Sequence, residues 1–307
     1  MLSPLTSTRR ALRAGATLAE LMVVLVILGI VGGVIMRVIL RQQRFYASAA
    51  EITSTRSDLR DLATMLPTDL RGISSSGGDI YAMSDSSIDF RLPVGTSTAC
   101  QIGIGLTSVV VPPVSLASRS AVTTWTTAPV SGDSLLIYDE GATSGTTDDT
   151  WRPFRISAAP TTASCPTSTG FTATAAEAAA GISLPLSIAL LATAPQGSPI
   201  VFFRRAHYGL FLTSSGKTML GYFDCPAGTC SAVTPVAGPF LPYAASGSGV
   251  QFTYYDSTGA VTAVRNQVAR IDVVVRAETA APVSLSAGDR SYVRDSLAFT
   301  VSLRNRQ

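Results

Sequence analysis

An apolar run near the N-terminus constrains this chain more than any other feature. Residues 21–36 carry no charge, and only three glycines interrupt their apolar side chains. The run is slightly shorter than the roughly 20 residues of an ordinary membrane-spanning helix. The short polar segment before it contains three basic residues, Arg9, Arg10 and Arg13. Because basic flanks stay on the cytoplasmic side, the run predicts a single inserted helix with the rest of the chain outside the cytoplasm.

A single acidic residue, Glu20, stands at the start of this run. An ionised carboxylate in hydrocarbon must find a partner or take up a proton. No small-residue cleavage site of the A-x-A kind follows the run, so a conventional secretory signal is not indicated. One hypothesis is cleavage before the run, between Gly15 and Ala16, which makes Glu20 the fifth residue of the mature chain. The alternative is an uncleaved signal anchor with a chance glutamate.

This arrangement resembles the N-terminal signal of type IV prepilins and pseudopilins. The shared features are a basic leader, a glycine before the cut, a glutamate at mature position five and an apolar helix. The matching residues are Gly15, Ala16, Thr17, Leu18 and Glu20. Ala16 departs from the phenylalanine usual at the first mature position. The resemblance implies that prepilin peptidase cleaves Gly15–Ala16 and methylates Ala16. It also implies that Glu20 pairs with the α-amino group of a neighbouring subunit inside a filament.

The helical pattern continues beyond the apolar run. Apolar residues recur every seven positions at Phe45, Ile52, Leu59 and Leu66. Pro67 is expected to bend or end the helix, with Gly72 closing its last turn. The helix then spans about 50 residues from Thr17, on the order of 75 Å. We expect its second half to lie on a sheet and its first half to protrude.

The remainder of the chain predicts a β-rich head. From Ser74 onward, short alternating segments rich in Ser, Thr, Gly, Ala and Val are separated by turn residues. The expected strands are 88–92, 101–111, 134–139, 154–157, 201–212, 218–223, 250–255, 268–276 and 297–303. The fold class is therefore α+β and pilin-like, with a long N-terminal helix packed on an antiparallel head.

The sequence predicts four segments of the chain. They are a leader at 1–15, a transmembrane and assembly half of the helix at 16–37, an amphipathic half at 38–73, and the head at 74–307. The head is expected to contain two subdomains divided near 158–196, a stretch rich in Thr, Ala, Ser and Pro.

A strand, turn and strand near the C-terminus resemble the ends of W-type minor pilins and J-type pseudopilins. A D-x-x-G turn separates the two strands. The residues that carry this resemblance are Phe252, Tyr254, Asp256, Gly259, Val268, Ile271 and Val273.

The four cysteines all lie in the part expected outside the cytoplasm, and disulfides are the leading interpretation. Cys225 and Cys230 flank Pro226 and Gly228, a composition that suits a tight loop closed by its own bridge. Cys100 would then pair with Cys165, although four cysteines allow three connectivities. A zinc site is not indicated, because the chain has a single histidine and no CxxC spacing.

Catalytic chemistry is not indicated. His207 stands beside two arginines without a nucleophile or an orienting acid at a suitable spacing.

The loop 139–149 gathers Asp139, Glu140, Asp148 and Asp149. These oxygens suit calcium, but their irregular spacing favours a solvated acidic loop. No cofactor or metal ligand is predicted. Nucleic-acid binding is not predicted either, because the net charge is only +3 and no basic cluster follows residue 60.

These features together favour a non-enzymatic subunit, a minor type IV pilin or a minor pseudopilin of type II secretion. The expected partners are prepilin peptidase, other pilins through the N-terminal helix, and the inner membrane. A large head suits a tip or initiation position. A second hypothesis is an uncleaved, membrane-anchored binding protein or adhesin. An anchored exported enzyme is a third.

Overall fold

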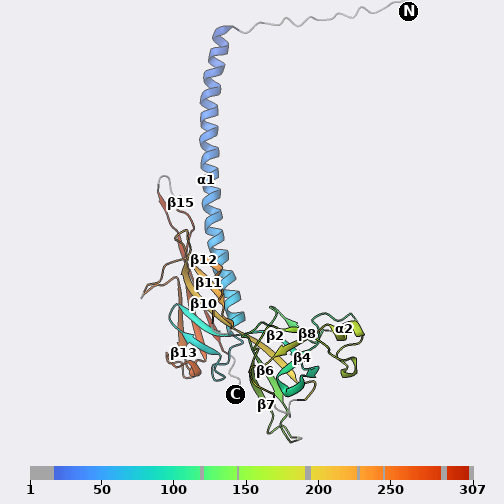
Figure 1. Ribbon diagram of the computed structural model, residues 1–307. Coiled ribbons are helices and arrows are strands. Elements are labelled where there is room, and N and C mark those ends of the chain that lie inside the picture. The colour runs from blue at the N-terminus through green and yellow to red at the C-terminus, as the bar shows by residue number, and fades with distance from the viewer. Residues whose placement is uncertain are drawn as a thin grey trace, which may run out of the picture.

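A long helix protrudes from a β-rich head (Figure 1). The computed structural model describes residues 17–117, 121–143, 145–190, 195–226, 229–244, 246–284 and 289–303. The helix, α1, spans Leu18–Leu70, and its first half lies outside the head. The head is built mainly from antiparallel strands. The predicted α+β class, a long N-terminal helix followed by an antiparallel β-rich head, is confirmed.

Helix α1 ends one turn later than the sequence predicts. Pro67 lies inside it and ends neither the helix nor its last turn. Proline has no N–H, so the carbonyl group four residues earlier loses its helical partner. The loss is offset because Leu66, Pro67 and Leu70 are all buried. The Pro67 carbonyl also accepts a hydrogen bond from the Arg71 N–H at 3.0 Å.

The predicted seven-residue stripe on α1 is only half correct. Leu59 and Leu66 are buried and Ile52 is half-buried, but Phe45 is 66% exposed. The helix contacts the head only from Ser48 onward, so Phe45 lies before the point where the head begins to cover it. The buried residues of the helix are Ser48, Thr55, Leu59, Leu62, Leu66, Pro67 and Leu70.

One large antiparallel sheet forms most of the head. Its path is β1-β2-β10-β11-β12-β14-β13, and β17 pairs with β14. The strands of this path are β1 (Ile80–Met83), β2 (Ser87–Thr98), β10 (Pro199–Leu212), β11 (Thr218–Asp224), β12 (Thr234–Phe240), β14 (Arg270–Glu278), β13 (Val250–Tyr255) and β17 (Arg294–Ser302). The predicted strands 201–212 and 218–223 correspond to β10 and β11, which form a hairpin with Leu212 opposite Thr218.

A second group of strands extends the head away from the helix. The sheet continues through β5 (Thr124–Trp125), β6 (Ser134–Asp139) and β7 (Thr150–Arg155). A separate four-stranded sheet has the order β3 (Gln101–Ile102), β4 (Ser108–Val111), β9 (Gly181–Pro185) and β8 (Thr161–Ala163). The short helix α2 covers Ala175–Ala179. A small hairpin of β15 (Val283–Ser284) and β16 (Arg290–Ser291) lies beside α1, where the Ser284 N–H donates to Ser48 Oγ at 3.2 Å.

Two large hydrophobic cores divide the head into lobes, and a third, small cluster contains Cys100, Val110 and Cys165. The helix lobe has its core between α1 and the sheet, with Leu62, Phe90 and Val273 among its buried residues. The distal lobe has its core around Leu135, Leu184 and other buried residues. β2 and β10 run through both lobes and pair at eleven positions, from Pro199 opposite Thr98 to Gly209 opposite Ser87. The lobes are therefore joined by two continuous strands.

The segment predicted to divide two subdomains does not do so. Residues 158–190 supply β8, α2 and β9 to the distal lobe. Their polar composition was misleading because β8 exposes Thr161 and Thr162, while Leu184 of β9 is fully buried. A strand with one solvated face needs few apolar residues.

The other strand predictions agree with the structure to within a few residues, with two kinds of error. Residues 101–111 were predicted as one strand, but a 3-10 turn at Ile104–Leu106 breaks them, where Gly105 has φ 76°. Seven strands were not predicted: β1, β5, β8, β9, β12, β15 and β16. β12 contains Pro235, Gly238 and Pro239, residues that ordinarily argue against a strand.

Candidate functional site

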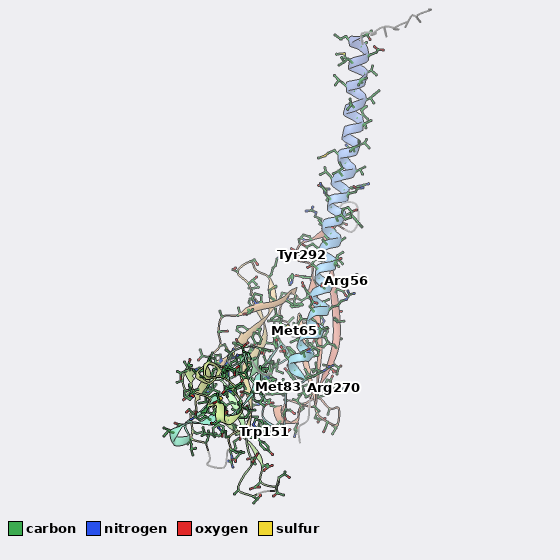
Figure 2. The ribbon with its side chains drawn as sticks, turned by 90° about the vertical axis from the view of Figure 1, so that its right-hand side faces the viewer. Arg56, Met65, Met83, Trp151, Arg270 and Tyr292 are labelled. Carbon is green, nitrogen blue, oxygen red and sulfur yellow. A yellow bond between two sulfur atoms is a disulfide. The ribbon has the colours of Figure 1, made fainter. Side chains whose placement is uncertain are left out.

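The most conspicuous surface of the protein is the first half of α1. We call Leu18–Leu40 the apolar half; every large apolar side chain in it is at least 40% exposed. These side chains project from the helix with no part of the head against them (Figure 2). The 23 residues extend over about 35 Å, and the uncharged run 21–36 between Glu20 and Arg37 covers about 24 Å of the roughly 30 Å of a bilayer's hydrocarbon core. The helix is therefore long and apolar enough to cross a membrane.

A capping box begins this helix. The Glu20 N–H donates to Thr17 Oγ1 at 3.3 Å, and the Thr17 N–H donates to Glu20 Oε2 at 2.9 Å. The Thr17 hydroxyl also donates to the same carboxylate oxygen at 3.2 Å. Two N–H groups that lack helical partners are thereby satisfied. A carboxylate in the first turn also interacts favourably with the helix dipole.

Glu20 thus has a hydrogen-bond partner within its own chain, Thr17, which was not predicted from the sequence. The signal for it was present, because T-x-x-E is the signature of a capping box. Gly15 and Ala16, the predicted processing residues, lie outside the described residues. The pairing of Glu20 with a neighbouring α-amino group therefore stays a prediction.

A shallow hollow of about 290 Å³ lies on one side of the apolar half. Its lining residues are Val24, Ile27, Leu28, Val31, Gly32 and Ile35. A Cβ atom added at Gly32 would meet nothing within 4 Å. The hollow is therefore made by a missing side chain between apolar neighbours at helical spacing. Such small-residue positions let a second helix approach closely.

The second half of α1 is docked on the head by apolar and polar contacts. Leu62 and Leu66 are at most 1% exposed in the core of the helix lobe. The Tyr208 hydroxyl donates to Asp69 Oδ2 at 2.5 Å. Burial raises the pKa of Asp69, while this hydrogen bond acts in the opposite direction. On the exposed side of the docked half, Arg56 Nε donates a hydrogen bond to Asp295 Oδ2 at 2.9 Å.

A buried ion pair links the two lobes on β10. Arg204 is 4% exposed and donates to both carboxylate oxygens of Asp133, at 2.9 and 2.7 Å. Its guanidinium also donates to the Ala128 carbonyl at 2.9 Å. The hydrogen bond to Asp133 raises the pKa of Arg204. The sequence reading did not find this pair, because its residues are far apart in the chain.

The cysteines are joined in two pairs. Cys100 is bridged to Cys165 with a Cα–Cα distance of 5.7 Å, and Cys225 to Cys230 with 3.8 Å. This is the connectivity that the loop composition around Cys225 favours. The long bridge closes 65 residues of the distal lobe, and the short one closes a loop at the end of β11.

Three of the four carboxylates of the acidic loop 139–149, those of Asp139, Asp148 and Asp149, have partners within the loop or beside it. Asp139 forms an ion pair with Arg152, and Asp149 accepts a hydrogen bond from Tyr138 at 2.5 Å. Asp148 accepts from the Ala142 and Thr143 N–H groups, and the Thr143 hydroxyl lowers its pKa. Over the parts of the chain that the structure describes, no group of three or more acidic, histidine or cysteine side chains is placed to hold a metal ion.

His207 lies on β10 with its ring against Phe223, at a centroid distance of 5.4 Å. Burial lowers its pKa. Its nearest charged neighbours, Asp89 and Arg205, form an ion pair with each other. The arrangement is that of a half-buried strand histidine.

Comparison of the chain with models of protein families, with curated proteins and with solved structures finds no match.

Proposed function

We propose that this protein is a minor type IV pilin or a minor pseudopilin of type II secretion, a non-enzymatic structural subunit of an envelope filament. The observation that carries the proposal is the division of α1. The apolar half is uncovered by its own chain, whereas the half after Ser48 is docked on the head. A helix with these two halves supports membrane insertion before assembly and helix packing afterwards.

In this mechanism the leader keeps the precursor in the inner membrane with the head outside the cytoplasm. Prepilin peptidase then cuts between Gly15 and Ala16 and methylates Ala16. The apolar halves of neighbouring subunits pack together, and the hollow at Gly32 receives a side chain of the next helix. Glu20 pairs with the new α-amino group of a neighbour. The size of the head favours a tip or initiation position, because bulky heads limit close stacking.

The capping box favours a second candidate function. Because Thr17 and Glu20 bond to each other within one chain, Glu20 has a structural role without any filament. The protein would then be an uncleaved, membrane-anchored binding module. The two candidates differ in the mature N-terminus. Intact-mass measurement and N-terminal sequencing of the protein from native membranes would give N-methylated Ala16 for the first candidate and Met1 for the second.

The variants Glu20→Gln and Glu20→Ala separate the two roles of this side chain. Glutamine retains the capping box but has no charge, so it should preserve the helix start. In a filament, loss of the charge leaves a buried α-amino group without its partner, which costs about 3–5 kcal/mol. We therefore expect both variants to lower incorporation into filaments at least a hundredfold. Incorporation is measured as the amount of the subunit in filaments sheared from the cells. Normal incorporation of Glu20→Gln together with loss in Glu20→Ala would leave capping as the sole role.

A further inference from the structure

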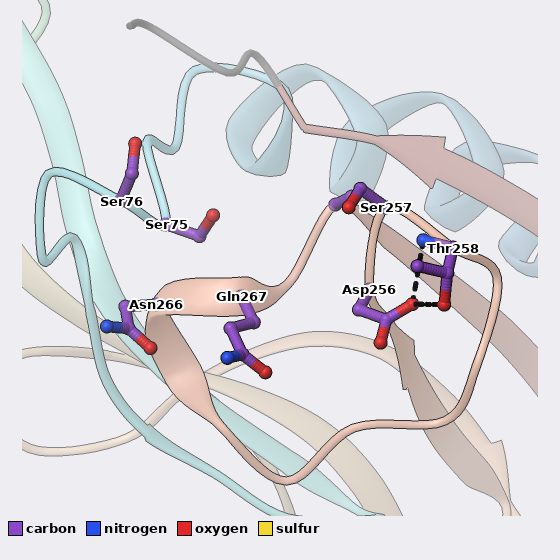
Figure 3. Close-up of a pocket in the computed structure, with 8 residues that line it drawn as sticks. Ser75, Ser76, Asp256, Ser257, Thr258, Asn266 and Gln267 are labelled. Atoms are coloured by element: carbon purple, nitrogen blue, oxygen red, sulfur yellow. Dashed lines mark hydrogen bonds between the residues drawn. The ribbon is translucent and has the colours of Figure 1, made fainter.

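A polar groove lies on the helix lobe beyond the end of α1. One cavity of about 410 Å³ lies between the segment after α1 and the β13–β14 connection (Figure 3). A second, of about 600 Å³, adjoins it and shares Ser75 and Asn266 with the first. Each volume falls within the roughly 300–1,000 Å³ of small-molecule sites. We call the two cavities together the polar groove.

Several hydrogen-bonding groups of the groove bond to none of the residues that the structure describes. Ser75 is 3% exposed, yet its hydroxyl has no hydrogen-bond partner among the described residues. The side-chain amides of Asn266 and Gln267 likewise bond to no described residue. Both of these amides line the first cavity, from the 3-10 turn Arg265–Gln267. An amide offers a donor and an acceptor, and a hydroxyl offers both in one atom.

The turn at Asp256 fixes one wall of the groove. Its Oδ1 accepts hydrogen bonds from the Thr258 N–H, the Thr258 hydroxyl and the Ala260 N–H, at 2.8, 2.6 and 3.0 Å. The other oxygen, Oδ2, has no partner among the described residues, and Asp256 lines the cavity. Hydrogen bonds from Thr258 lower the pKa of Asp256, so the carboxylate is ionised at neutral pH.

Tyr81 supplies an aromatic surface in the second cavity. Its ring is held by the Arg205 guanidinium, which lies 4.9 Å from the ring centroid. Its hydroxyl accepts a hydrogen bond from Arg91 at 3.3 Å. Arg265 is engaged with the Tyr81 carbonyl. The ring is therefore fixed in place before any ligand arrives, which lowers the cost of binding.

We propose that the polar groove binds a neutral oligosaccharide. Sugar hydroxyls both donate and accept, so they match unpaired amides, a hydroxyl and one carboxylate oxygen, and a fixed tyrosine suits the apolar face of a sugar ring. A cation is disfavoured because the groove has one carboxylate with half of its oxygens used. An anion is disfavoured because Asp256 repels it and Arg265 is already bonded. The proposal does not depend on filament assembly.

The test uses the full chain in a sugar-free zwitterionic detergent, because glycoside detergents would compete for the groove. A glycan panel of neutral hexose, N-acetylhexosamine and uronic-acid oligomers identifies the strongest ligand, and calorimetric titration gives its affinity. We expect a neutral oligomer to bind. Asn266→Ala and Gln267→Ala should each weaken binding about fivefold, the effect of one lost hydrogen bond. Gln101→Ala, an exposed glutamine of the distal lobe, is the matched control and should leave the affinity unchanged.

Three results would overturn the proposal. The first is that no oligomer of the panel binds. The second is that binding is unaffected by Asn266→Ala and Gln267→Ala, which would place the sugar elsewhere. The third is that calcium alone raises the melting temperature of the wild type but not of Asp256→Asn, with no sugar bound, which would make the groove a cation site. Filament incorporation of the same variants should equal that of the wild type, so the proposed assembly role is tested separately.

Discussion

The two halves of α1 should respond in opposite ways to the same substitution, leucine to alanine. Leu62 is 1% exposed in the core of the helix lobe, and Leu28 is 63% exposed beside the hollow at Gly32. Truncating a fully buried leucine costs about 2–5 kcal/mol, because it loses transfer free energy and leaves a cavity. A change of 1 kcal/mol shifts the melting temperature by roughly 2–4 °C in a unit of this size. Leu62→Ala should therefore lower the melting temperature by about 4–20 °C.

Leu28→Ala is the matched control for stability and the test variant for assembly. Its side chain contacts no part of the head, so the melting temperature should change by about 1 °C or less. Helix packing in a filament would lose a side chain, and incorporation should fall several-fold. Melting is followed by near-ultraviolet circular dichroism in detergent, and incorporation by quantifying the subunit in sheared filaments. Equal melting temperatures for the two variants would refute the docking of α1, and unchanged assembly of Leu28→Ala would refute the role of the apolar half.

Three further predictions concern the head. Asp133→Ala leaves the buried Arg204 guanidinium with only its longer ion pair to Asp224, at 3.5 Å, and should cost about 3 kcal/mol in urea unfolding, whereas Asp133→Leu with Arg204→Met should recover most of the loss. Burial raises the folded-state pKa of Asp69 above its ordinary 3.8, so the folded chain binds more protons in acid and stability falls as pH rises through that window; melting curves of Asp69→Asn should lack this decline. Replacing Cys100 and Cys165 by serine opens a 65-residue loop and should cost about 4 kcal/mol, read from the urea midpoint.

The N-terminal helix was the part most readily predicted from sequence. A long uncharged run and a heptad of apolar residues have few alternatives to a helix, and α1 follows both. The expectation that Pro67 bends or ends the helix rests on the ordinary role of proline as a helix terminator. Burial of Leu70 in the core, a tertiary effect, carried the helix further.

The distal lobe was harder to predict, for physical reasons. β8 and β9 form one side of a small four-stranded sheet, and β8 exposes Thr161 and Thr162, so the segment resembles a linker in composition. The polar groove could not be predicted from the sequence either. Ser75 and Gln267 are brought together only by the packing of the loop after α1 against the β13–β14 connection. The capping box of Thr17 and Glu20, in contrast, could have been predicted from the T-x-x-E spacing of the sequence.

The continuity of β2 and β10 has a mechanical consequence. Tension between α1 and the tip of the distal lobe would travel along two covalent backbones, cross-linked by an eleven-position ladder, and would meet no linker that could stretch. A load on the distal lobe is thus delivered directly to the sheet that holds α1. The head would transmit the force without extending. The first contact to break under force would be the packing of α1 against the sheet.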